Sequence, residues 1–586
     1  MRRFLFPLSI VFIFLPSILA VSLKADNQSP ETFNTVRFAI IGDRTGGAVP
    51  GIYEQIVEEI ERLKPEFVIT VGDMIEGPEN NEERLHKKWK EYLSIVSHLS
   101  MPIYYTPGNN DIESDLMEKY YNEYIGAPYY SFDYKGIHII ILDNSRWSTS
   151  NDLPEIQINW LIEDLKNNQD ARYKIAFCHK PFWERSIVDG IPDTLHNLFQ
   201  TYGVDAMFSG HYHSYFSGKY DDIIYTNVGS SGGGIDGPGP TGLEYHFVWV
   251  TVDDKEISIA PIKMGAVLPW DEVTADENNF VFSAQSELIS FPKSFLVNDK
   301  GQSGDFDFEV TINNLHPEIA LKDSIRWDSP DGWSIEPPIM PIEVGPDSSE
   351  TYIFEINYSK SLYPLPDISV NFPYAIDKNA STSKQLPAAR QTSCLKTSKK
   401  PKIDGDISED FWKSSTTSLY DYSGGKTKTD SVRFYFAYDK KNLYLASYCA
   451  DSKIDSMTTE ITEFDGAVYG DDCVGFILQP NRASENMYLI YTNAKGIIFD
   501  QSIANNIAGY YDSDESWNGD IEVKTKIGKD YWSFEMRLPL SQFGNIDEDN
   551  IWGLNMRRKQ PRLDDAAHWQ IPWRYGPDFL GQLIME

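Results

Sequence analysis

The pattern of apolar and polar positions changes along the chain and divides it into parts with different secondary structure. From about residue 37 to residue 265, short apolar runs alternate with stretches of helical periodicity. The runs Arg37–Asp43 and Phe67–Asp73 are typical of buried strands, and Ile52–Leu63 between them repeats its apolar residues at helical spacing. This alternation predicts a layered α/β domain whose helices cover a buried sheet. Further strands are expected at Ile103–Thr106, Lys174–Cys178 and Ala206–Ser209, and a further helix at Asn159–Leu165.

The second half of the chain lacks helical periodicity. Short alternating stretches such as Tyr352–Tyr358 are separated by Pro, Gly and Asp clusters, which predicts an antiparallel β-sandwich over residues 279–375. Residues 376–394 are rich in Ser, Thr and Lys and are expected to form a linker or an entering strand. Residues 395–586 are again β-rich and are expected to form a second all-β sandwich.

Length and charge limit the classes of function. A chain of 586 residues is too long for one hydrophobic core and is expected to form about three domains. Its formal charge of −35, with no long basic run, argues against nucleic-acid binding through phosphate contacts. Four cysteines are too few for a disulfide scaffold; Cys449 and Cys473 lie on predicted neighbouring strands, where they either pair or stay buried thiols.

The first residues indicate the compartment. Arg2 and Arg3 precede the apolar run Phe4–Ala20, and small residues follow it, which is the pattern of a secretory signal peptide over residues 1–22. Two prolines inside the run favour cleavage over a membrane anchor, and no later stretch approaches the roughly 20 apolar residues of a spanning helix. The sequence therefore predicts a secreted or periplasmic protein with no transmembrane anchor after signal removal.

Polar side chains that suit metal binding follow successive predicted strands, in the motifs GD, GD, GNND, HKP and GHYH. In an open α/β sheet, ligands collect at the carboxyl ends of strands. Two carboxylates, one amide oxygen and three imidazoles suit a pair of divalent ions. GHYH is the strongest of these motifs, because two histidines one residue apart can both reach a metal. The predicted ligands are Asp43, Asp73, Asn109, His179, His211 and His213, with Asp73 as the bridge.

Over roughly residues 36–265 these motifs resemble the calcineurin-like metallophosphoesterase superfamily. The resemblance implies a four-layer α/β fold, a β-sandwich flanked by helices, with two divalent metals such as Mn, Fe or Zn. The implied reaction is hydrolysis of a phosphate mono- or diester by two-metal activation of water. The implied first metal is held by Asp43, Asp73 and His213, and the second by Asp73, Asn109, His179 and His211.

Two positions depart from the pattern of that superfamily. Thr45 and Asn110 stand where the superfamily has histidines, so we expect a weaker first metal site and reduced help to the leaving group. Glu76 either replaces the missing ligand, as a tyrosine at that offset does in purple acid phosphatases, or only bonds within its loop. Asn110, as a neutral hydrogen-bond donor, and Arg44, as a phosphate-binding cation, are the predicted catalytic residues.

Residues 279–375 weakly resemble the immunoglobulin-like modules of secreted carbohydrate-active enzymes, and residues 395–586 resemble family-9-like carbohydrate-binding modules. The second resemblance rests on Lys402–Glu409, Asp471–Phe476 and Trp532–Arg537. It implies a β-sandwich that binds sugars on aromatic faces and holds a structural Ca²⁺. Candidate calcium ligands are Glu463, Asp471 and Asp472, and the candidate sugar platform is Trp517, Trp569 and Trp573, each of which also suits a structural role.

The leading hypothesis is therefore a metallophosphoesterase with accessory domains that bind a polysaccharide or a cell-surface glycan. Its substrate is a phosphate ester that the sequence does not name. The alternative is a catalytically weak or inactive phosphoesterase-like adhesion protein, in which Thr45 and Asn110 mark a lost active site. A third hypothesis makes the C-terminal module a haem-binding relative.

Overall fold

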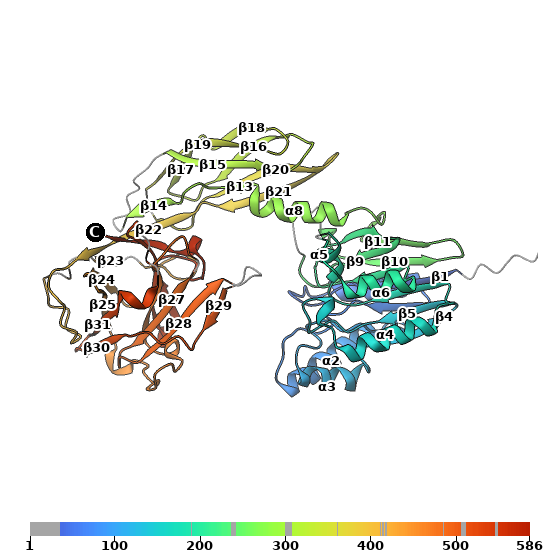
Figure 1. Cartoon of the computed structure of the whole chain (residues 1–586), viewed down its shortest axis with the longest axis horizontal. Helices are drawn as coiled ribbons and strands as arrows, with labels where there is room; N and C mark the ends of the chain where they lie inside the picture. The colour runs from blue at the N-terminus through green and yellow to red at the C-terminus, as the bar shows by residue number, and fades with distance from the viewer. Residues whose placement is uncertain are drawn as a thin grey trace, which may run out of the picture. The chain divides into compact units, whose positions relative to one another are not determined.

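The computed structural model describes residues 35–586 except for 189, 236–241, 299–306, 360, 411, 413–414, 417–418, 485, 506–510, 545 and 547–548. The predicted signal peptide, residues 1–22, lies outside the described residues. The chain forms two compact units, an N-terminal one that ends at Thr274 and a C-terminal one over Ala275–Glu586 (Figure 1). Among the described residues, no helix is both long and apolar enough to cross a membrane.

Two six-stranded sheets form the centre of the N-terminal unit. The first has the order β12-β11-β10-β1-β2-β3, with β1, β2 and β3 parallel and β10 antiparallel to β1. Its strands are β1 (Val36–Ile41), β2 (Phe67–Thr70), β3 (Ile103–Tyr104), β10 (His246–Val252), β11 (Ile257–Lys263) and β12 (Ala266–Val267).

The second sheet has the order β4-β5-β6-β7-β9-β8, with parallel pairing from β5 through β6 and β7 to β9. Aromatic side chains join the two sheets: the ring of Phe38 lies 6.5 Å from that of Phe177, and Phe67 lies 6.2 Å from Phe132. The strands are β4 (Tyr130–Tyr134), β5 (Ile137–Ile141), β6 (Tyr173–Phe177), β7 (Ala206–Ser209), β8 (Phe216–Tyr220) and β9 (Ile223–Asn227).

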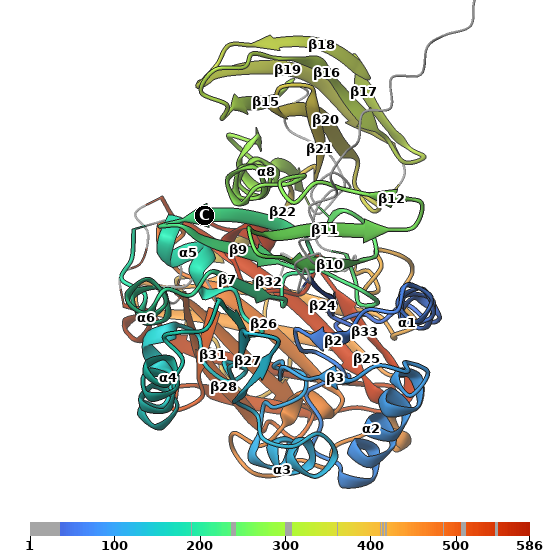
Figure 2. The same ribbon diagram turned by 90° about the vertical axis from the view of Figure 1, so that its right-hand side faces the viewer.

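Helices cover the outer faces of the sheets and complete a four-layer α/β fold, as the sequence predicts. Figure 2 shows α1 and α2 on one side of this unit and α4 and α6 on the other. Buried residues of α1, α2 and α3, among them Ile60, Trp89 and Tyr121, pack in one cluster with Ala39 and Ile41 of β1. The helices are α1 (Ile52–Leu63), α2 (Glu82–Val96), α3 (Asp115–Tyr124), α4 (Glu155–Asn167), α5 (Phe182–Val188) and α6 (Thr194–Tyr202).

One histidine of the second sheet is buried between two carboxylates. His138, on β5, is 2% exposed; its Nδ1 lies 2.8 Å from Asp133 Oδ1 and its Nε2 lies 2.7 Å from Asp164 Oδ2. Burial alone would lower its pKa, but the hydrogen bonds to Asp164 and Asp133 outweigh burial and raise the pKa above its usual value. The imidazolium form is therefore stabilised in the folded unit.

The C-terminal unit begins with helix α8 (Ala275–Glu287) and a sandwich of two four-stranded sheets, with the orders β13-β15-β19-β17 and β18-β16-β20-β21. Inward-facing residues such as Val310, Ile325 and Phe354 form its core. The strands are β13 (Ile289–Ser290), β15 (Asp307–Asn314), β16 (Leu321–Asp328), β17 (Trp333–Glu336), β18 (Ile339–Val344), β19 (Ser348–Tyr358), β20 (Asp367–Ala375) and β21 (Lys378–Gln385).

The rest of the unit is a continuous sheet that folds over on itself, so that Phe476 of β26 meets Phe434 of β24 and Phe534 of β31 in one core. The remaining strands are β14 (Phe295–Asn298), β22 (Ala388–Lys396), β23 (Ser415–Thr416), β24 (Val432–Tyr438), β25 (Asn442–Ala450), β26 (Cys473–Gln479), β27 (Met487–Asn493), β28 (Ile498–Asn505), β29 (Tyr511–Asp514), β30 (Glu522–Ile527), β31 (Tyr531–Pro539), β32 (Ile551–Gln560), β33 (Asp565–His568) and β34 (Gly581–Met585).

Of the two alternatives for the stretch 376–394, a linker or an entering strand, the structure has strands. The stretch contains β21, which pairs with β20 of the first sandwich, and most of β22, which pairs with β34 and β24 of the large sheet. In β21 the exposed Ser381 and Ser383 alternate with the buried Ala380 and Thr382, as in a strand with one buried face. The segment therefore consists of strands that lead from one β-rich part into the next.

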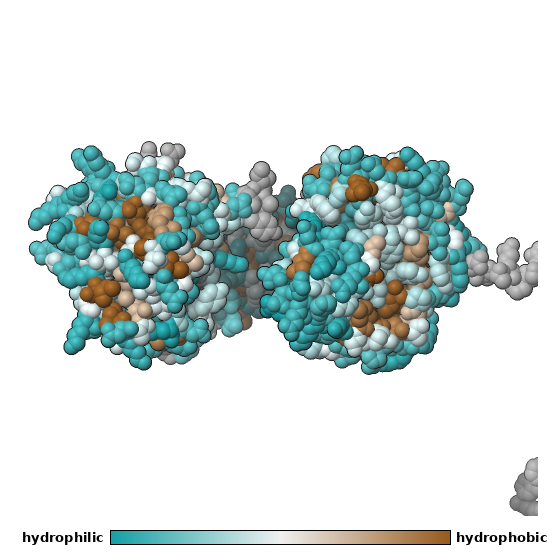
Figure 3. Space-filling model, turned by 90° about the horizontal axis from the view of Figure 1, so that it is seen from below, coloured by the Kyte–Doolittle hydropathy of each residue, from teal (hydrophilic) through white to brown (hydrophobic). Residues whose placement is uncertain are grey.

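The four cysteines are free and buried. Cys449 points into the core of the folded sheet, whereas Cys473 belongs to a separate cluster on the opposite face of its strand, so the two do not pair. On the face of the molecule seen in Figure 3, hydrophobic residues form small patches within a mostly hydrophilic surface on both units.

Candidate metal centre

The six predicted ligands lie at one edge of the two central sheets. Parallel strands bring their carboxyl ends to the same edge, and each predicted ligand follows such an end. Asp43 follows β1, Asp73 follows β2, Asn109 follows β3, His179 follows β6, and His211 and His213 follow β7.

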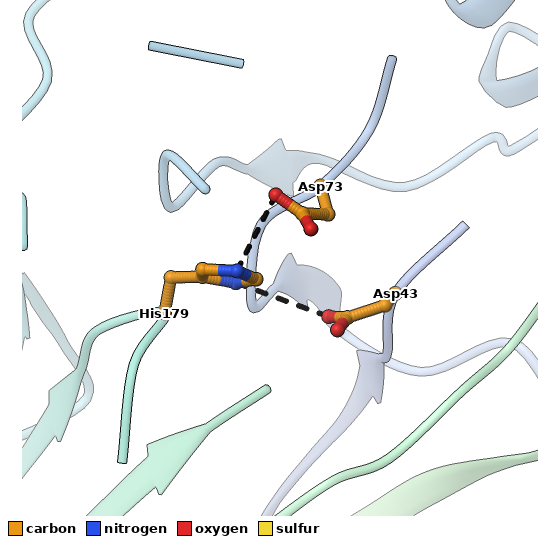
Figure 4. A group of neighbouring side chains, drawn as sticks. All are labelled: Asp43, Asp73 and His179. Carbon is orange, nitrogen blue, oxygen red and sulfur yellow. Dashed lines mark ion pairs between the residues drawn. The ribbon is translucent and has the colours of Figure 1, made fainter. Parts of the chain in front are cut away.

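His179 lies at the centre of this group. Its Nε2 is 3.0 Å from Asn109 Oδ1 and 3.3 Å from Asp73 Oδ1, and its Nδ1 is 3.9 Å from Asp43 Oδ1 (Figure 4). The two remaining histidines adjoin the carboxylate of Asp43. His213 Nε2 is 3.5 Å from Asp43 Oδ2, and the backbone N–H of His211 donates to that oxygen at 2.7 Å. Side chains far apart in the sequence thus meet at one point.

A backbone carbonyl fixes the orientation of the His179 ring. Its Nδ1 lies 2.8 Å from the carbonyl oxygen of Val71, which accepts the ring N–H in the tautomer that leaves the Nε2 lone pair facing Asp73 and Asn109. A hydrogen bond of this kind on the far nitrogen is the usual way in which proteins orient a metal-binding imidazole.

The loops that carry the ligands adopt constrained backbone conformations. Asp73 and His211 have φ angles of 52° and 70°, in the left-handed region that non-glycine residues rarely adopt. Gly108 packs so closely against Asp73 that a Cβ at this position would lie 2.2 Å from both the backbone N and the Oδ1 of Asp73. The side chain of Asp73 is therefore held by close backbone packing as well as by its neighbours.

The donor set fits divalent cations. Among the described residues, one group of three His, Cys, Asp or Glu side chains has potential ligand atoms that all lie within 4.8 Å of one another, and it is Asp43, Asp73 and His179. Asp43 is fully buried, and its Oδ1 has no hydrogen-bond partner in the described part of the chain. A buried carboxylate oxygen without a partner is costly unless a cation compensates it.

The buried carboxylates and imidazoles of the group shift one another's pKa values. Burial raises the pKa of Asp43 well above its ordinary value, and although His179 opposes that shift, the nearby charge of Asp73 adds to it. Burial also lowers the pKa of His211 to about 3, with a further contribution from His179, so its imidazole is neutral at pH 7. His179 differs from His211: burial opposes its charged form, but the adjacent carboxylates of Asp73 and Asp43 outweigh burial and raise its pKa to about 9. A divalent cation held by this group would displace that proton.

The two residues that replace superfamily histidines contact each other. Asn110 Nδ2 donates to Asp73 Oδ2 at 3.0 Å and to Thr45 Oγ1 at 3.3 Å. The hydroxyl of Thr45 lies 2.9 Å from the carbonyl oxygen of Asp73 and 3.0 Å from that of Ile75. Thr45 and Asn110 therefore form a small hydrogen-bonded pair that braces Asp73 from one side.

Arg44 and Glu76 both make contacts within the protein. The guanidinium of Arg44 donates to the carbonyl of Met74 at 3.0 Å and to Glu91 Oε1 at 2.7 Å, so it is committed to the protein rather than free to bind a phosphate. Glu76 is exposed and lies outside the group of potential ligands. Its backbone carbonyl accepts a hydrogen bond from Lys88, which favours the alternative in which Glu76 only bonds within its loop.

Asp111 has a structural role that the sequence analysis missed. It is fully buried, and it accepts hydrogen bonds from the backbone N–H groups of Gly108, Met74 and Ile75 at 2.9, 2.9 and 3.1 Å. The loop after β2 and the loop after β3 are thereby joined through one carboxylate. Its place as the last residue of GNND, beside a predicted ligand, was the signal available in the sequence.

The tryptophans proposed as a sugar platform occupy different environments. Trp569 is fully buried and offers no face to a ligand. Trp517 is partly buried and packs with its ring 4.8 Å from that of Tyr488, against the core of the folded sheet. Trp573 is partly exposed and belongs to a separate aromatic cluster on the outer side of β26, β27 and β28.

The candidate calcium ligands are also engaged elsewhere. Asp471 accepts from the N–H groups of Glu460 and Ile461 and from Asn493, and Asp472 accepts from the N–H of Thr458 and from Arg562. These two carboxylates fix the loop before β26. Neither they nor Glu463 belongs to a group of potential metal ligands among the described residues.

Comparisons with known proteins agree with the N-terminal geometry. The serine/threonine-protein phosphatase CPPED1 of Danio rerio is 27% identical over 192 residues, which are 29% of this chain and 62% of that protein. Purple acid phosphatase 18 of Arabidopsis thaliana is 24% identical over 236 residues, which are 35% of this chain and 52% of that protein. The chain thus spans less than two thirds of the length of these relatives.

Among solved structures, a family 9 carbohydrate-binding module from Caldicellulosiruptor kristjanssonii in complex with cellotriose matches 33% of this chain and 93% of that chain, at 16% identity and a TM-score of 0.25. A likeness at this level carries no argument about function. Residues 36–215 match the family model for calcineurin-like phosphoesterases. Over these residues the chain therefore resembles the calcineurin-like phosphoesterase family in sequence, and its N-terminal unit has the corresponding metallophosphoesterase-like α/β fold.

Proposed function

We propose that this protein is a metal-dependent phosphoester hydrolase that acts outside the cytoplasm. The observation that carries the proposal is the meeting of Asp43, Asp73, Asn109 and three histidines around a buried carboxylate oxygen that has no hydrogen-bond partner in the described part of the chain. The phosphatase relatives and the signal-peptide pattern of residues 1–22 support it.

Two divalent cations would be held by these six side chains, with Asp73 shared between them. When bound, such ions supply Lewis acidity toward phosphoryl oxygens and lower the pKa of water. The protein residues fix the ligands: Val71 orients His179, Asp111 joins the loops of Asp73 and Asn109, and Asn110 and Thr45 brace Asp73.

The residues present also restrict the substrate. Asn110 stands where a proton donor to the leaving group is expected, and an amide cannot act as a general acid. General acid catalysis contributes about 10²–10⁴-fold, so its absence penalises poor leaving groups most. We therefore infer that the preferred substrates are phosphate esters whose leaving group departs without protonation, such as aryl esters.

Metal analysis combined with hydrolysis of p-nitrophenyl phosphate and bis(p-nitrophenyl) phosphate tests the proposal. Wild-type protein should contain Mn, Fe or Zn and hydrolyse at least one of the two esters, and His211→Ala should abolish turnover. The matched control is His98→Ala, which removes an exposed histidine remote from the site and should leave turnover unchanged. If wild type and His211→Ala are equally inert with every divalent ion, the hydrolase proposal is wrong, and the non-catalytic alternative gains support.

A second function, carbohydrate binding by the C-terminal unit, is favoured by the aromatic cluster around Trp573. Tyr469, which is 44% exposed, lies with its ring 5.4 Å from that of Phe499 and 6.2 Å from that of Tyr491, and Tyr491 lies 6.2 Å from Trp573. Tyr469 is exposed and Trp573 partly exposed at the edge of this cluster, and aromatic rings so placed suit stacking on the apolar faces of sugar rings. Trp573→Ala should weaken binding to a glycan array while leaving phosphoester hydrolysis unchanged.

A further inference from the structure

The aromatic cluster around Trp573 contains an arginine without a polar partner. Arg557 on β32 has its guanidinium carbon 4.9 Å from the ring centre of Tyr491 and 4.6 Å from that of Trp573. In the described part of the chain it makes no hydrogen bond or ion pair, and its Nε is buried without a partner. A guanidinium carries five N–H donors in a planar fork, so unused donors at a surface are open to a ligand.

A glycine makes this arrangement possible. Gly475 on β26 is paired on one side with Tyr491 of β27 and on the other with Arg557 of β32. A Cβ at Gly475 would lie 2.3 Å from Tyr491 Cε1, so the ring of Tyr491 occupies the space that a side chain would fill. The ring thereby reaches across the sheet toward Arg557, and the guanidinium is held against two rings at once.

Among the described residues, no acidic side chain forms an ion pair with Arg557. Two carboxylates on neighbouring loops accept hydrogen bonds from other groups: Asp565 accepts from Thr427 and the N–H of Lys428, and Asp421 accepts from Ser423 and the N–H of Gly425. A second cation, Lys559, lies two residues along the same strand and donates to the carbonyl of Tyr469 at 2.7 Å. Two cationic side chains, Arg557 and Lys559, thus adjoin the aromatic cluster.

A buried histidine beside Trp573 adds a further unused polar group. The ring of His568 lies 5.9 Å from that of Trp573; the residue is 2% exposed, and its Nδ1 has no partner in the described residues. Gln501 also reaches the cluster, where its Nε2 donates to the hydroxyl of Tyr575 at 3.2 Å. Aromatic faces, a cation and neutral polar groups are therefore gathered on one side of the sheet.

We propose that this face is selective for a sugar that carries a carboxylate, with Arg557 as the residue that recognises the carboxylate. Stacking on Trp573 and Tyr469 accommodates the ring of any sugar, whereas a planar guanidinium pairs with a carboxylate through two parallel hydrogen bonds. A neutral sugar leaves the cation desolvated and unpaired, which is unfavourable. This inference rests on the proposed carbohydrate binding of the C-terminal unit and names its ligand class.

The test measures binding of the full-length protein to tri-galacturonate and to cellotriose by isothermal titration calorimetry. The expected result is at least about tenfold tighter binding of the uronate, since only the uronate forms a charged hydrogen-bonded pair with the guanidinium. Arg557→Gln should remove this preference while binding of cellotriose persists. Arg574→Gln, which removes an exposed cation one residue from Trp573, is the matched control and should keep the preference.

The outcomes separate this inference from the proposal on which it rests. If both sugars bind equally and Arg557→Gln changes neither, carboxylate selectivity is refuted and carbohydrate binding stands. If Arg574→Gln abolishes the preference as fully as Arg557→Gln, the effect is general electrostatics, and the assignment to Arg557 is refuted. If neither sugar binds and Trp573→Ala changes nothing, both proposals fail. Equal melting temperatures of the variants and the wild type show that each variant is folded.

Discussion

Replacing Asp111 by alanine tests whether one buried carboxylate holds the metal-ligand loops together. In the structure this side chain is fully buried and accepts three backbone hydrogen bonds, two from the loop after Asp73 and one from Gly108. The substitution leaves three N–H donors without an acceptor in a site from which most water is excluded. No other side chain in the described residues accepts from these three donors.

The expected cost follows from these hydrogen bonds. An unsatisfied buried donor costs about 1–3 kcal/mol, so three donors imply a loss of at least about 3 kcal/mol of local stability. That is a large fraction of the roughly 5–15 kcal/mol that holds a typical domain together. Asp111→Asn keeps the size and one acceptor oxygen and should cost less than Asp111→Ala.

Hydrogen exchange measured by mass spectrometry detects the change locally. The peptides that contain Met74, Ile75 and Gly108 should exchange at least about 100-fold faster in Asp111→Ala, because each 1.4 kcal/mol corresponds to tenfold. The bound metal content should fall as well, since Asp73 and Asn109 lose their common anchor. The control is Asp115→Ala, whose side chain is 99% exposed and which should change exchange in these peptides by less than twofold.

The reasoning is refuted if Asp111→Ala protects these amides as well as the wild type does and retains full metal content. That result would mean that the close packing of Gly108 against Asp73 is sufficient to position both loops. The acceptance of three amides by one carboxylate would then be a consequence of the loop geometry and not its cause.

Three further predictions follow from the same structure. Gly108→Ala should abolish metal binding, measured by elemental analysis, because its Cβ would lie 2.2 Å from Asp73 Oδ1; unchanged metal content would contradict the packing argument. Asn110→His should raise kcat/KM for alkyl phosphates by about 10²-fold or more and for aryl phosphates much less, and an equal effect on both would show that no general acid was restored. His138→Gln should destabilise the protein more at pH 6 than at pH 9. The raised pKa of His138 stabilises the fold below pH 6.5, the unfolded pKa, and this contribution is lost as pH rises through the folded pKa. Urea unfolding at the two pH values measures the destabilisation, and an equal loss of unfolding free energy at both would refute the prediction.

The regular elements were predictable from local patterns. Helix α1 has the bounds expected from its periodicity, Ile52–Leu63, and β7 has the expected bounds Ala206–Ser209. Predicted strands such as Phe67–Asp73 are shorter in the structure, because their last residues leave the sheet to carry the site. The positions of the motifs after predicted strands were sufficient to predict that the six candidate ligands lie close together, since parallel pairing brings the carboxyl ends of strands to one edge of a sheet.

The directions of individual side chains were not predictable. Arg44 adjoins Asp43 in the sequence, yet its guanidinium pairs with Glu91 on helix α2. Trp569 and Trp573 are four residues apart, yet one is fully buried and the other lies in the outer aromatic cluster. The direction and burial of a side chain depend on which distant segment of the chain packs against it. A sequence pattern over a short window does not contain that information.

By itself, the sequence determined the order of helices and strands, the acidic character of the chain, and the positions at which metal-binding side chains leave the strands of the N-terminal unit. These are local properties, set by periodicity and by residue type. Only the tertiary structure decided that Asp111 joins two loops, that Thr45 and Asn110 brace Asp73 together, and that Gly475 lets Tyr491 reach Arg557. Each of these contacts joins different strands or loops, and the burial that gives it energetic weight exists only once the sheets have packed.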